Sequence, residues 1–214
     1  WIPPGTNIVI ARREESTHCD GPCERVRRVP EEQYAYLLGL YLGDGCLTCH
    51  RRGIYPLRIA LDVRYPSIIE ECESAMAGVL PNKVGRVACP GCVSVNAYSK
   101  HWPCLFPQHA PGPKHMRPIV LEPWQERIGL EEHPRLLLRG LIHSDGYRGI
   151  NRIKGGAYSY PRYMFSNRSA DIRDIFTAAC HRIGIHPTQC GGWQLSVARR
   201  NDVALMDSFI GPKQ

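Results

Sequence analysis

The sequence has no long apolar run, few acidic residues and little lysine. No stretch of its 214 residues approaches the roughly 18 apolar residues that a membrane-spanning helix needs, and no basic-then-apolar signal opens the chain. Asp and Glu number 20 against 27 Lys and Arg, and only five of those cations are lysines. These shortages argue against a membrane or secreted protein. We therefore expect a soluble intracellular protein, in the cytoplasm or nucleoid of a prokaryote or phage host.

The excess of positive charge favours a polyanionic partner. The net charge is +7, and from Tyr147 to Gln214 ten Lys or Arg stand against four Asp, which leaves +6 in that segment. Nucleic acid is the first candidate and membrane lipid the second, and Arg suits bidentate contacts to phosphate and guanine. An ordinary basic globular protein would show the same charge, so charge alone leaves the partner open.

The chain has ten cysteines, and without a secretory signal reduced thiols are expected rather than a disulfide framework. A C-x-x-C pair is half of a zinc site only when a second half-site approaches it. The sequence therefore leaves a structural Zn²⁺ open without favouring it over scattered small apolar thiols. The candidates are the pairs Cys46/Cys49 and Cys89/Cys92 and the local group His18, Cys19 and Cys23.

One nine-residue pattern occurs twice, as "LLGLYLGDG" at 37–45 and "LRGLIHSDG" at 138–146. The offset between the two Asp positions is 145 − 44 = 101 residues, close to half of the chain, which indicates an internal duplication. The predicted division is an N-terminal arm or extension (1–30), a first repeat (31–106), a Pro-rich linker (107–133) and a second repeat (134–214).

The elements expected around the two copies follow the same order. Periodicity and turn residues predict a helix, strands, a helix, a hairpin and a helix in each half. Gly45 is expected to end the first motif helix in the left-handed conformation, and Ser169 and Asn201 are expected to cap helices. The predicted ranges are 31–45, 57–65, 66–80, 84–99 and 101–106, a linker helix at 123–130, and then 134–146, 150–153, 163–167, 169–185, 188–200 and 201–210.

Small residues recur four apart in each motif, at Gly39 and Gly43 and at Gly140 and Ser144. Residues at that spacing share one face of a helix, and small side chains there let two backbones approach closely. We therefore expect the two motif helices to pack against each other.

This packing would bring Asp44 and Asp145 together at two helix C-termini, where the macrodipole is already negative. A cation must offset the repulsion, and hard oxygen ligands select Mg²⁺ or a similar divalent ion. Paired carboxylates that hold divalent metal are suited to in-line phosphodiester hydrolysis. Two unrelated helices ending in Asp-Gly are the alternative, and the matching contexts of the two copies argue against it.

The paired motifs and the repeated element order, over roughly residues 31–211, resemble the LAGLIDADG homing endonuclease family in its monomeric, two-motif form. The resemblance implies an α+β fold of two pseudo-symmetric αββαββα repeats, packed through the two LAGLIDADG helices, with antiparallel sheets forming a DNA-binding saddle. It also implies a metal site at Asp44 and Asp145, together with the preceding residues Gly43 and Ser144. For His143, two positions before Asp145, a structural role is favoured over a contact to solvent or DNA.

The resemblance assigns further catalytic roles. A basic residue is expected near each scissile phosphate, at the end of each second hairpin, because charge builds on the phosphoryl oxygens there. A polar residue in each early strand is expected to orient water. These positions are Lys100 and Arg199 for the cations and Asp62 and Ser166 for the polar residues, with Arg200 and Asn167 as alternatives in the second half.

The sheet faces are expected to read DNA through alternating side chains, since Arg can contact guanine and Asn or Gln can contact adenine. The segment "NRIKGGAYSYPRY" (151–163) interleaves cations with tyrosines, which suits phosphate contacts. The expected DNA-binding residues are Arg58, Arg64, Asn96, Arg148, Arg152, Lys154, Arg162, Asn167, Gln194 and Arg200.

The implied function is a site-specific double-strand DNA endonuclease that acts as a monomer on a long asymmetric target. It would use divalent-metal-activated water to hydrolyse one phosphodiester in each strand. Mg²⁺ is the expected cofactor, Mn²⁺ is expected to substitute, and Ca²⁺ is expected to support binding without turnover. The alternative is a non-catalytic DNA-binding regulator or an RNA maturase on the same fold, and retention of both aspartates and of Lys100 favours catalysis. The endonuclease domain of an intein is a further alternative, although no splicing residues are expected here.

Overall fold

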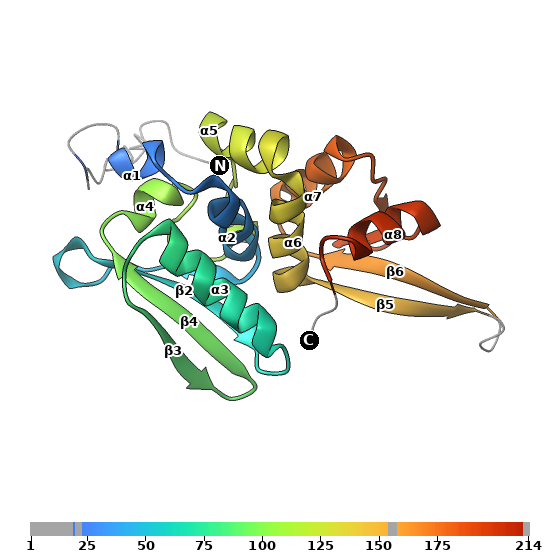
Figure 1. Ribbon diagram of the computed structural model, residues 1–214, viewed down its shortest axis with the longest axis horizontal. Helices are drawn as coiled ribbons and strands as arrows, with labels where there is room; N and C mark the ends of the chain where they lie inside the picture. Colours follow the sequence, from blue (N-terminus) through green and yellow to red (C-terminus); the bar gives the residue numbers. More distant parts are fainter. Residues whose placement is uncertain (1–18, 20–22, 154–157, 212–214) are drawn as a thin grey trace, which may run out of the picture.

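The computed structural model describes Cys19, residues 23–153 and residues 158–211. Two helices, α2 (Glu31–Asp44) and α6 (Pro134–Asp145), stand side by side at the centre, and a four-stranded antiparallel sheet lies on either side of them (Figure 1). The strand orders are β1-β2-β4-β3 and β5-β6-β8-β7, so the second sheet repeats the topology of the first. The α+β class and the two αββαββα repeats expected from the sequence are confirmed.

The first sheet separates apolar from polar side chains by alternation along its strands. In β2, Leu57, Ile59 and Leu61 are buried, whereas Arg58 is exposed. The buried set faces the helices of the first half, which leaves the other face of the sheet open. The elements of this half are α1 (Glu24–Arg27), β1 (Gly45–Leu47), η1 (Arg51–Gly53), β2 (Tyr55–Asp62), α3 (Pro66–Val79), β3 (Val84–Cys89), β4 (Cys92–Ser99) and α4 (Trp102–Leu105).

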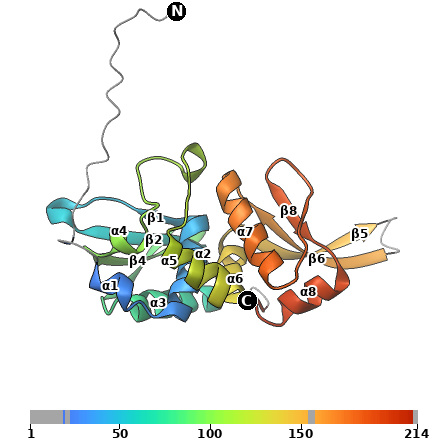
Figure 2. The same ribbon diagram turned by 90° about the horizontal axis from the view of Figure 1, so that it is seen from above.

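The second half is built in the same way, and Figure 2 shows the two halves on opposite sides of α2 and α6. Its elements are β5 (Gly146–Ile153), β6 (Tyr158–Ser166), α7 (Ala170–Arg182), β7 (Thr188–Gln189), β8 (Gln194–Val197) and α8 (Arg200–Asp207). The linker contains η2 (Lys114–Met116), α5 (Pro123–Glu126) and the π-helical turn η3 (Arg127–Glu132). Within the described residues, no helix is long and apolar enough to cross a membrane.

Two expectations about helix ends are wrong. Gly45 is extended, with φ −81° and ψ 147°, because the chain passes directly from α2 into β1 and has no need of a left-handed cap. Asn201 lies inside α8, whose N-cap is Arg199. Ser169 does cap α7, since its hydroxyl accepts a hydrogen bond from the Ile172 amide, as expected.

The strand expected at 57–65 ends earlier than the sequence pattern indicates. The Asp62 carboxylate accepts a hydrogen bond of 2.9 Å from the Arg64 amide, which closes a turn and ends β2. The next helix then begins with Pro66 at its first position, where proline's missing N–H carries no penalty. Arg64 therefore lies beyond the sheet rather than on its face.

The central helix pair is packed backbone against backbone. A Cβ atom placed on Gly39 would lie 2.8 Å from the Leu141 nitrogen, and one placed on Gly140 would lie 2.9 Å from the Gly39 Cα. Small residues at these positions are thus required for the helices to approach so closely. One hydrophobic core extends through both halves around this pair, with Leu38 and Leu138 fully buried within it.

We expect Gly39→Ala to lower the free energy of unfolding by at least about 1–3 kcal/mol, since the new methyl group meets backbone that cannot move aside. Gly78→Ala in α3 is the matched control, because its Cβ would meet only the flexible Gln33 side chain, at 3.1 Å. Alanine favours a helix over glycine by up to about 1 kcal/mol, so the control should not be destabilised. Urea denaturation measures both variants, and wild-type stability of Gly39→Ala would show that the helices do not touch there.

Candidate active site and nucleic-acid face

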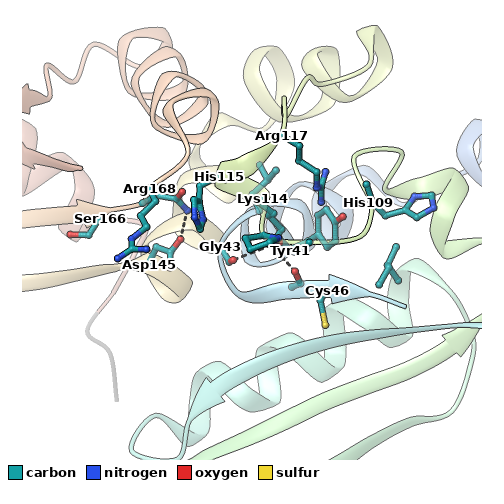
Figure 3. A pocket seen from close by; sticks show the side chains of 17 residues that line it. Tyr41, Gly43, Cys46, His109, Lys114, His115, Arg117, Asp145, Ser166 and Arg168 are labelled. Carbon is teal, nitrogen blue, oxygen red and sulfur yellow. Dashed lines mark hydrogen bonds between the residues drawn. The ribbon is translucent and has the colours of Figure 1, made fainter. Parts of the chain in front are cut away.

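The ends of α2 and α6 bring the two motif aspartates to one place. Asp145 is half-buried and lines a cleft of about 440 Å³ together with Gly43 (Figure 3). Asp44 is exposed and lines an adjoining cleft of about 250 Å³ together with Ser144. A Cβ atom on Gly43 would lie 3.0 Å from Asp145 Oδ2, so the missing side chain leaves room beside this carboxylate.

Each aspartate has one of the predicted polar residues in its cleft. Asp62, the last residue of β2, lines the cleft of Asp44, and Ser166, the last residue of β6, lines the cleft of Asp145. The Asp62 carboxylate is also held by the Arg64 guanidinium, with 2.9 Å from Nε to Oδ2 and 2.6 Å from Nη2 to Oδ2. The structure thus brings both predicted polar residues to the aspartates.

Asn167 orients the Asp145 carboxylate. Its Nδ2 donates a hydrogen bond of 2.5 Å to Asp145 Oδ2, while its own Oδ1 accepts from the Ser169 amide at 2.8 Å. Gly45 pairs with Ile59 and Gly146 pairs with Phe165, so the position in the first half that corresponds to Asn167 is Leu61, two residues after Ile59. Leu61 is buried. The two halves of the site therefore differ in how they hold their aspartates.

Lys114, from the linker, reaches the end of α2, a contact that the sequence pattern does not predict. Its ammonium donates to the carbonyl oxygens of Tyr41, Gly43 and Gly45 at 2.5, 3.0 and 2.6 Å, and it lies 4.9 Å from the centre of the Tyr41 ring. These carbonyls are the negative end of the helix, which a cation stabilises. The only signal in the sequence is that Lys114 is the one lysine in a proline-rich linker.

The charge of Lys114 is in balance between burial and the aspartates. Burial lowers the pKa of Lys114 to about 8 from an ordinary value of 10.5, while the negative charges of Asp145 and Asp44 act in the opposite direction. The ammonium therefore lies close enough to both carboxylates to feel their charge. It is a cation at the point where the motif aspartates require one.

This shift in pKa predicts a pH dependence of stability. Between pH 8 and 10.5 the folded protein binds fewer protons at Lys114 than the unfolded chain does, so the free energy of unfolding contributed by this group rises with pH. We expect the stability of wild type relative to Lys114→Met to rise across that window, measured by urea denaturation. The exposed Lys83 supplies the control, Lys83→Met, which should keep the wild-type pH profile. A pH-independent difference for Lys114→Met would contradict the assignment.

Lys100 and Arg199 lie away from the aspartates. Gly45 pairs with Ile59, but Ser99, the residue before Lys100, pairs with Tyr55 at the other end of β2. Four residues of strand separate these levels, or roughly 13 Å. Arg199 likewise stands four residues beyond Leu195, which pairs with Phe165 beside Gly146. Neither cation lines the cleft of Asp44 or of Asp145, because each strand runs away from the helix ends before reaching them.

Four of the predicted DNA-reading residues lie on the open faces of the sheets. Arg58 and Asn96 are cross-strand partners in β2 and β4, and their neighbours in sequence turn toward the core. In the second sheet, Gln194 pairs with Ser166 at one end of β6, and Arg162, four residues from Ser166, shares its face. These positions fit side chains that alternate along a nucleic-acid surface.

Other predicted DNA contacts are placed differently. Arg148 pairs with Tyr163 across β5 and β6 and turns to the helix side, where its guanidinium binds Asp207 of α8 at 2.7 and 2.9 Å. Arg152 shares that alternation and is exposed, and Arg200 is exposed at the start of α8. Lys154 lies outside the described residues.

The remaining motif residues have structural partners. His143 is buried, with Nδ1 2.9 Å from the Tyr36 hydroxyl and Nε2 3.3 Å from the Ile210 carbonyl, which fits the structural role favoured for it. The Ser144 hydroxyl donates within its own helix, to Gly140 and Leu141. Because Ser144 Oγ is bonded in this way and the Gly43 carbonyl accepts from Lys114, the two carboxylates are the donors best placed for a metal. Carboxylate oxygens are hard ligands and fit Mg²⁺ or Mn²⁺.

Two motif helices that end in carboxylates, between two four-stranded antiparallel sheets of equal topology, define the LAGLIDADG fold in its single-chain, two-motif form. Solved structures share it at low identity. Mesophilic variants of the homing endonuclease I-DmoI match with a TM-score of 0.58 and 16% identity, over 87% of this chain and 97% of that one. I-DmoI in complex with DNA and Mn matches with a TM-score of 0.59 and 15% identity, over 86% and 99%.

A protein described in other terms has the same fold. The N-terminal LAGLIDADG domain of DUF199/WhiA matches with a TM-score of 0.53 and 14% identity, over 89% of this chain and 88% of that one. No protein-family model matches the chain. No curated protein matches it either. The comparisons therefore show the fold, and the activity has to be inferred from the site.

Proposed function

We propose that this chain is a site-specific, divalent-metal-dependent DNA endonuclease that acts as a monomer and hydrolyses one phosphodiester in each strand of a long asymmetric site. The observation that carries the proposal is the meeting of Asp44 and Asp145 at paired helix ends, beside the buried cation of Lys114. Carboxylates at helix C-termini are unfavourable in a purely structural role. A retained pair of them is therefore best explained by a cation that they hold.

The residues have distinct roles in this proposal. Asp44 and Asp145 hold the divalent ion, which when bound supplies Lewis-acid charge to phosphoryl oxygens and lowers the pKa of a water molecule. Asn167 fixes the Asp145 carboxylate through its hydrogen bond. Asp62 and Ser166 face the two clefts and orient water. Solved I-DmoI structures with Mn or Mg support this choice of ion.

Lys114 takes the role that the family resemblance assigned to Lys100. Its positive charge lies beside both aspartates, where negative charge builds on the phosphate during hydrolysis. It is positioned by three carbonyl oxygens of one helix end, so little reorganisation is needed when substrate arrives. Lys100, Arg199 and Arg200, far from the helix ends, are assigned to contacts with the DNA backbone.

The open faces of the two sheets supply the DNA-reading surface. Arg58 and Asn96 in the first half differ from Arg162 and Gln194 in the second, so the two half-sites are expected to differ in sequence. I-DmoI complexes with DNA support this use of the fold. The two repeats at 31–106 and 134–214, joined by the linker at 107–133, are the units proposed to read one half-site each. Most of the arm at 1–30 lies outside the described residues.

A non-catalytic DNA-binding regulator is the second candidate, because the WhiA domain shares the fold. A regulator needs the sheet faces but has no need of paired carboxylates at the helix ends. An RNA maturase is separated from both by its substrate.

Incubation with a randomised double-stranded DNA library tests the proposal. With Mg²⁺ or Mn²⁺ we expect staggered double-strand ends within one recurrent sequence, and with Ca²⁺ we expect retention of the same DNA without cutting. Enriched binding with no ends under any of these ions would support the regulator. Preferential binding of structured RNA over the DNA library would support the maturase.

A further inference from the structure

Four ligand-type side chains meet at the edge of the first half, far from the aspartates. Cys19 and Cys23 precede α1, and His101 and Cys104 belong to the start of α4. α1 lies beside α4 (Figure 1), so two segments about 80 residues apart in sequence come into contact here. The three sulfurs and one imidazole nitrogen all lie within 4.8 Å of one another.

The separations among these atoms fit one tetrahedral metal ion. His101 Nδ1 lies 3.6 Å from Cys19 Sγ and 3.5 Å from Cys23 Sγ, and the Sγ atoms of Cys19 and Cys104 are 3.9 Å apart. With Zn–S of about 2.3 Å and Zn–N of about 2.0–2.1 Å, tetrahedral geometry places two sulfurs about 3.8 Å apart and a sulfur about 3.5–3.6 Å from a nitrogen. The observed values agree with these to about 0.1 Å.

We propose that Cys19, Cys23, His101 and Cys104 bind one structural Zn²⁺ that fixes the segment before α1 to the start of α4. Binding releases the three thiol protons, because the thiolate is the metal ligand. Four protein ligands fill the tetrahedral shell and leave no open position for substrate, which makes the site structural rather than catalytic. Thiolates are soft ligands, so this ion is distinct from the hard divalent ion at the aspartates.

The pattern in sequence is C-x₃-C followed by H-x₂-C, with 77 residues between Cys23 and His101. The C-x-x-C pairs considered as candidates from the sequence are not its halves. Among the described residues, neither Cys46/Cys49 nor Cys89/Cys92 belongs to a group of three or more ligand atoms within this reach. His18 lies outside the described residues.

The site has a mechanical purpose in the fold. α1 is a single turn with no buried residue of its own, so little apolar packing holds it in place. A closed zinc site contributes folding free energy directly. The ion would therefore hold the N-terminal segment against the first half and stabilise the turn between β4 and α4.

The test is the metal content of the purified full chain, measured by elemental mass spectrometry. We expect about one zinc per chain, and near zero for Cys104→Ser and for Cys19→Ser. The controls are Cys49→Ser and Cys89→Ser, which remove exposed thiols of the C-x-x-C pairs and should leave one zinc bound. Absence of zinc in wild type, or its loss in a control but not in Cys104→Ser, would overturn the proposal.

A second measurement on the wild-type protein covers variants that fail to fold. Titration with a mercurial reagent in the presence of a zinc-sensitive dye should release one zinc in step with three thiols. Replacement by Co²⁺ should give the absorption bands of a tetrahedral thiolate complex. A disulfide between Cys19 and Cys104, found by peptide mass mapping in place of metal, would refute the site.

Discussion

Asp44→Asn and Asp145→Asn should each abolish double-strand cleavage while leaving DNA binding largely intact. The amide has the shape of the carboxylate but lacks its charge, so it no longer attracts a divalent ion. Loss of one preorganised electrostatic group commonly costs a factor of about 10²–10³ in rate, and loss of a metal-binding carboxylate should reach at least the upper end of that range. Single-turnover cleavage with saturating enzyme measures the effect.

Asp174→Asn on the exposed side of α7 is the matched control. It removes the same charge from the same type of side chain, so general electrostatic effects on DNA association appear in it equally. Its cleavage rate should stay at the wild-type level. Full cutting by either motif variant would remove the aspartates from the mechanism and leave the DNA-binding regulator as the better description.

Lys114→Met should slow cleavage by a factor of about 10²–10³ at saturating enzyme, with a much smaller change in DNA affinity. Methionine keeps much of the apolar stem and removes the ammonium that lies between the helix end and the aspartates. A loosened α2 terminus would also slow cleavage, so the thermal midpoint is measured alongside. Lys114→Arg retains a cation, and partial recovery of the rate with it separates charge from packing.

Lys100→Ala distinguishes the two assignments of the catalytic cation. If the sequence-based assignment holds, this variant slows cutting and binds normally. The strand register predicts the reverse: weaker binding, a salt slope reduced by about one, and a normal rate once the DNA is saturated. Arg199→Ala should behave in the same way.

Most of the fold is predictable from the sequence because its signals are local. Apolar spacing, the Ser169 cap and the Pro90-Gly91 turn each act within a few residues, and the duplicated order of elements follows from them. The pairing of the motif helices is also predictable, since Gly39 and Gly140 give each helix a face that only close backbone packing uses. Asn167, the partner of Asp145, is only one of two options in the sequence, because a strand face changes with a shift of one residue.

The features that the sequence does not predict depend on how distant segments return. Lys114 stands 70 residues after Asp44 in a stretch without regular periodicity, and nothing local indicates that its ammonium reaches α2. The position of Lys100 depends on the direction of β4 relative to β2, which the strand register sets. The cluster of Cys19, Cys23, His101 and Cys104 joins two chain segments that share no spacing rule.

The backbone contact between α2 and α6 also constrains how the chain folds. The interface joins positions about 100 residues apart, so most of the chain must be synthesised and its ends brought together before these contacts form. Closing so long a loop costs entropy that contacts within one half cannot repay, and non-local contacts of this kind slow folding. Because one core extends through both halves, neither half keeps its apolar face covered alone. The early chain therefore exposes the Leu-rich side of α2 until its counterpart is complete, a period in which aggregation competes with folding.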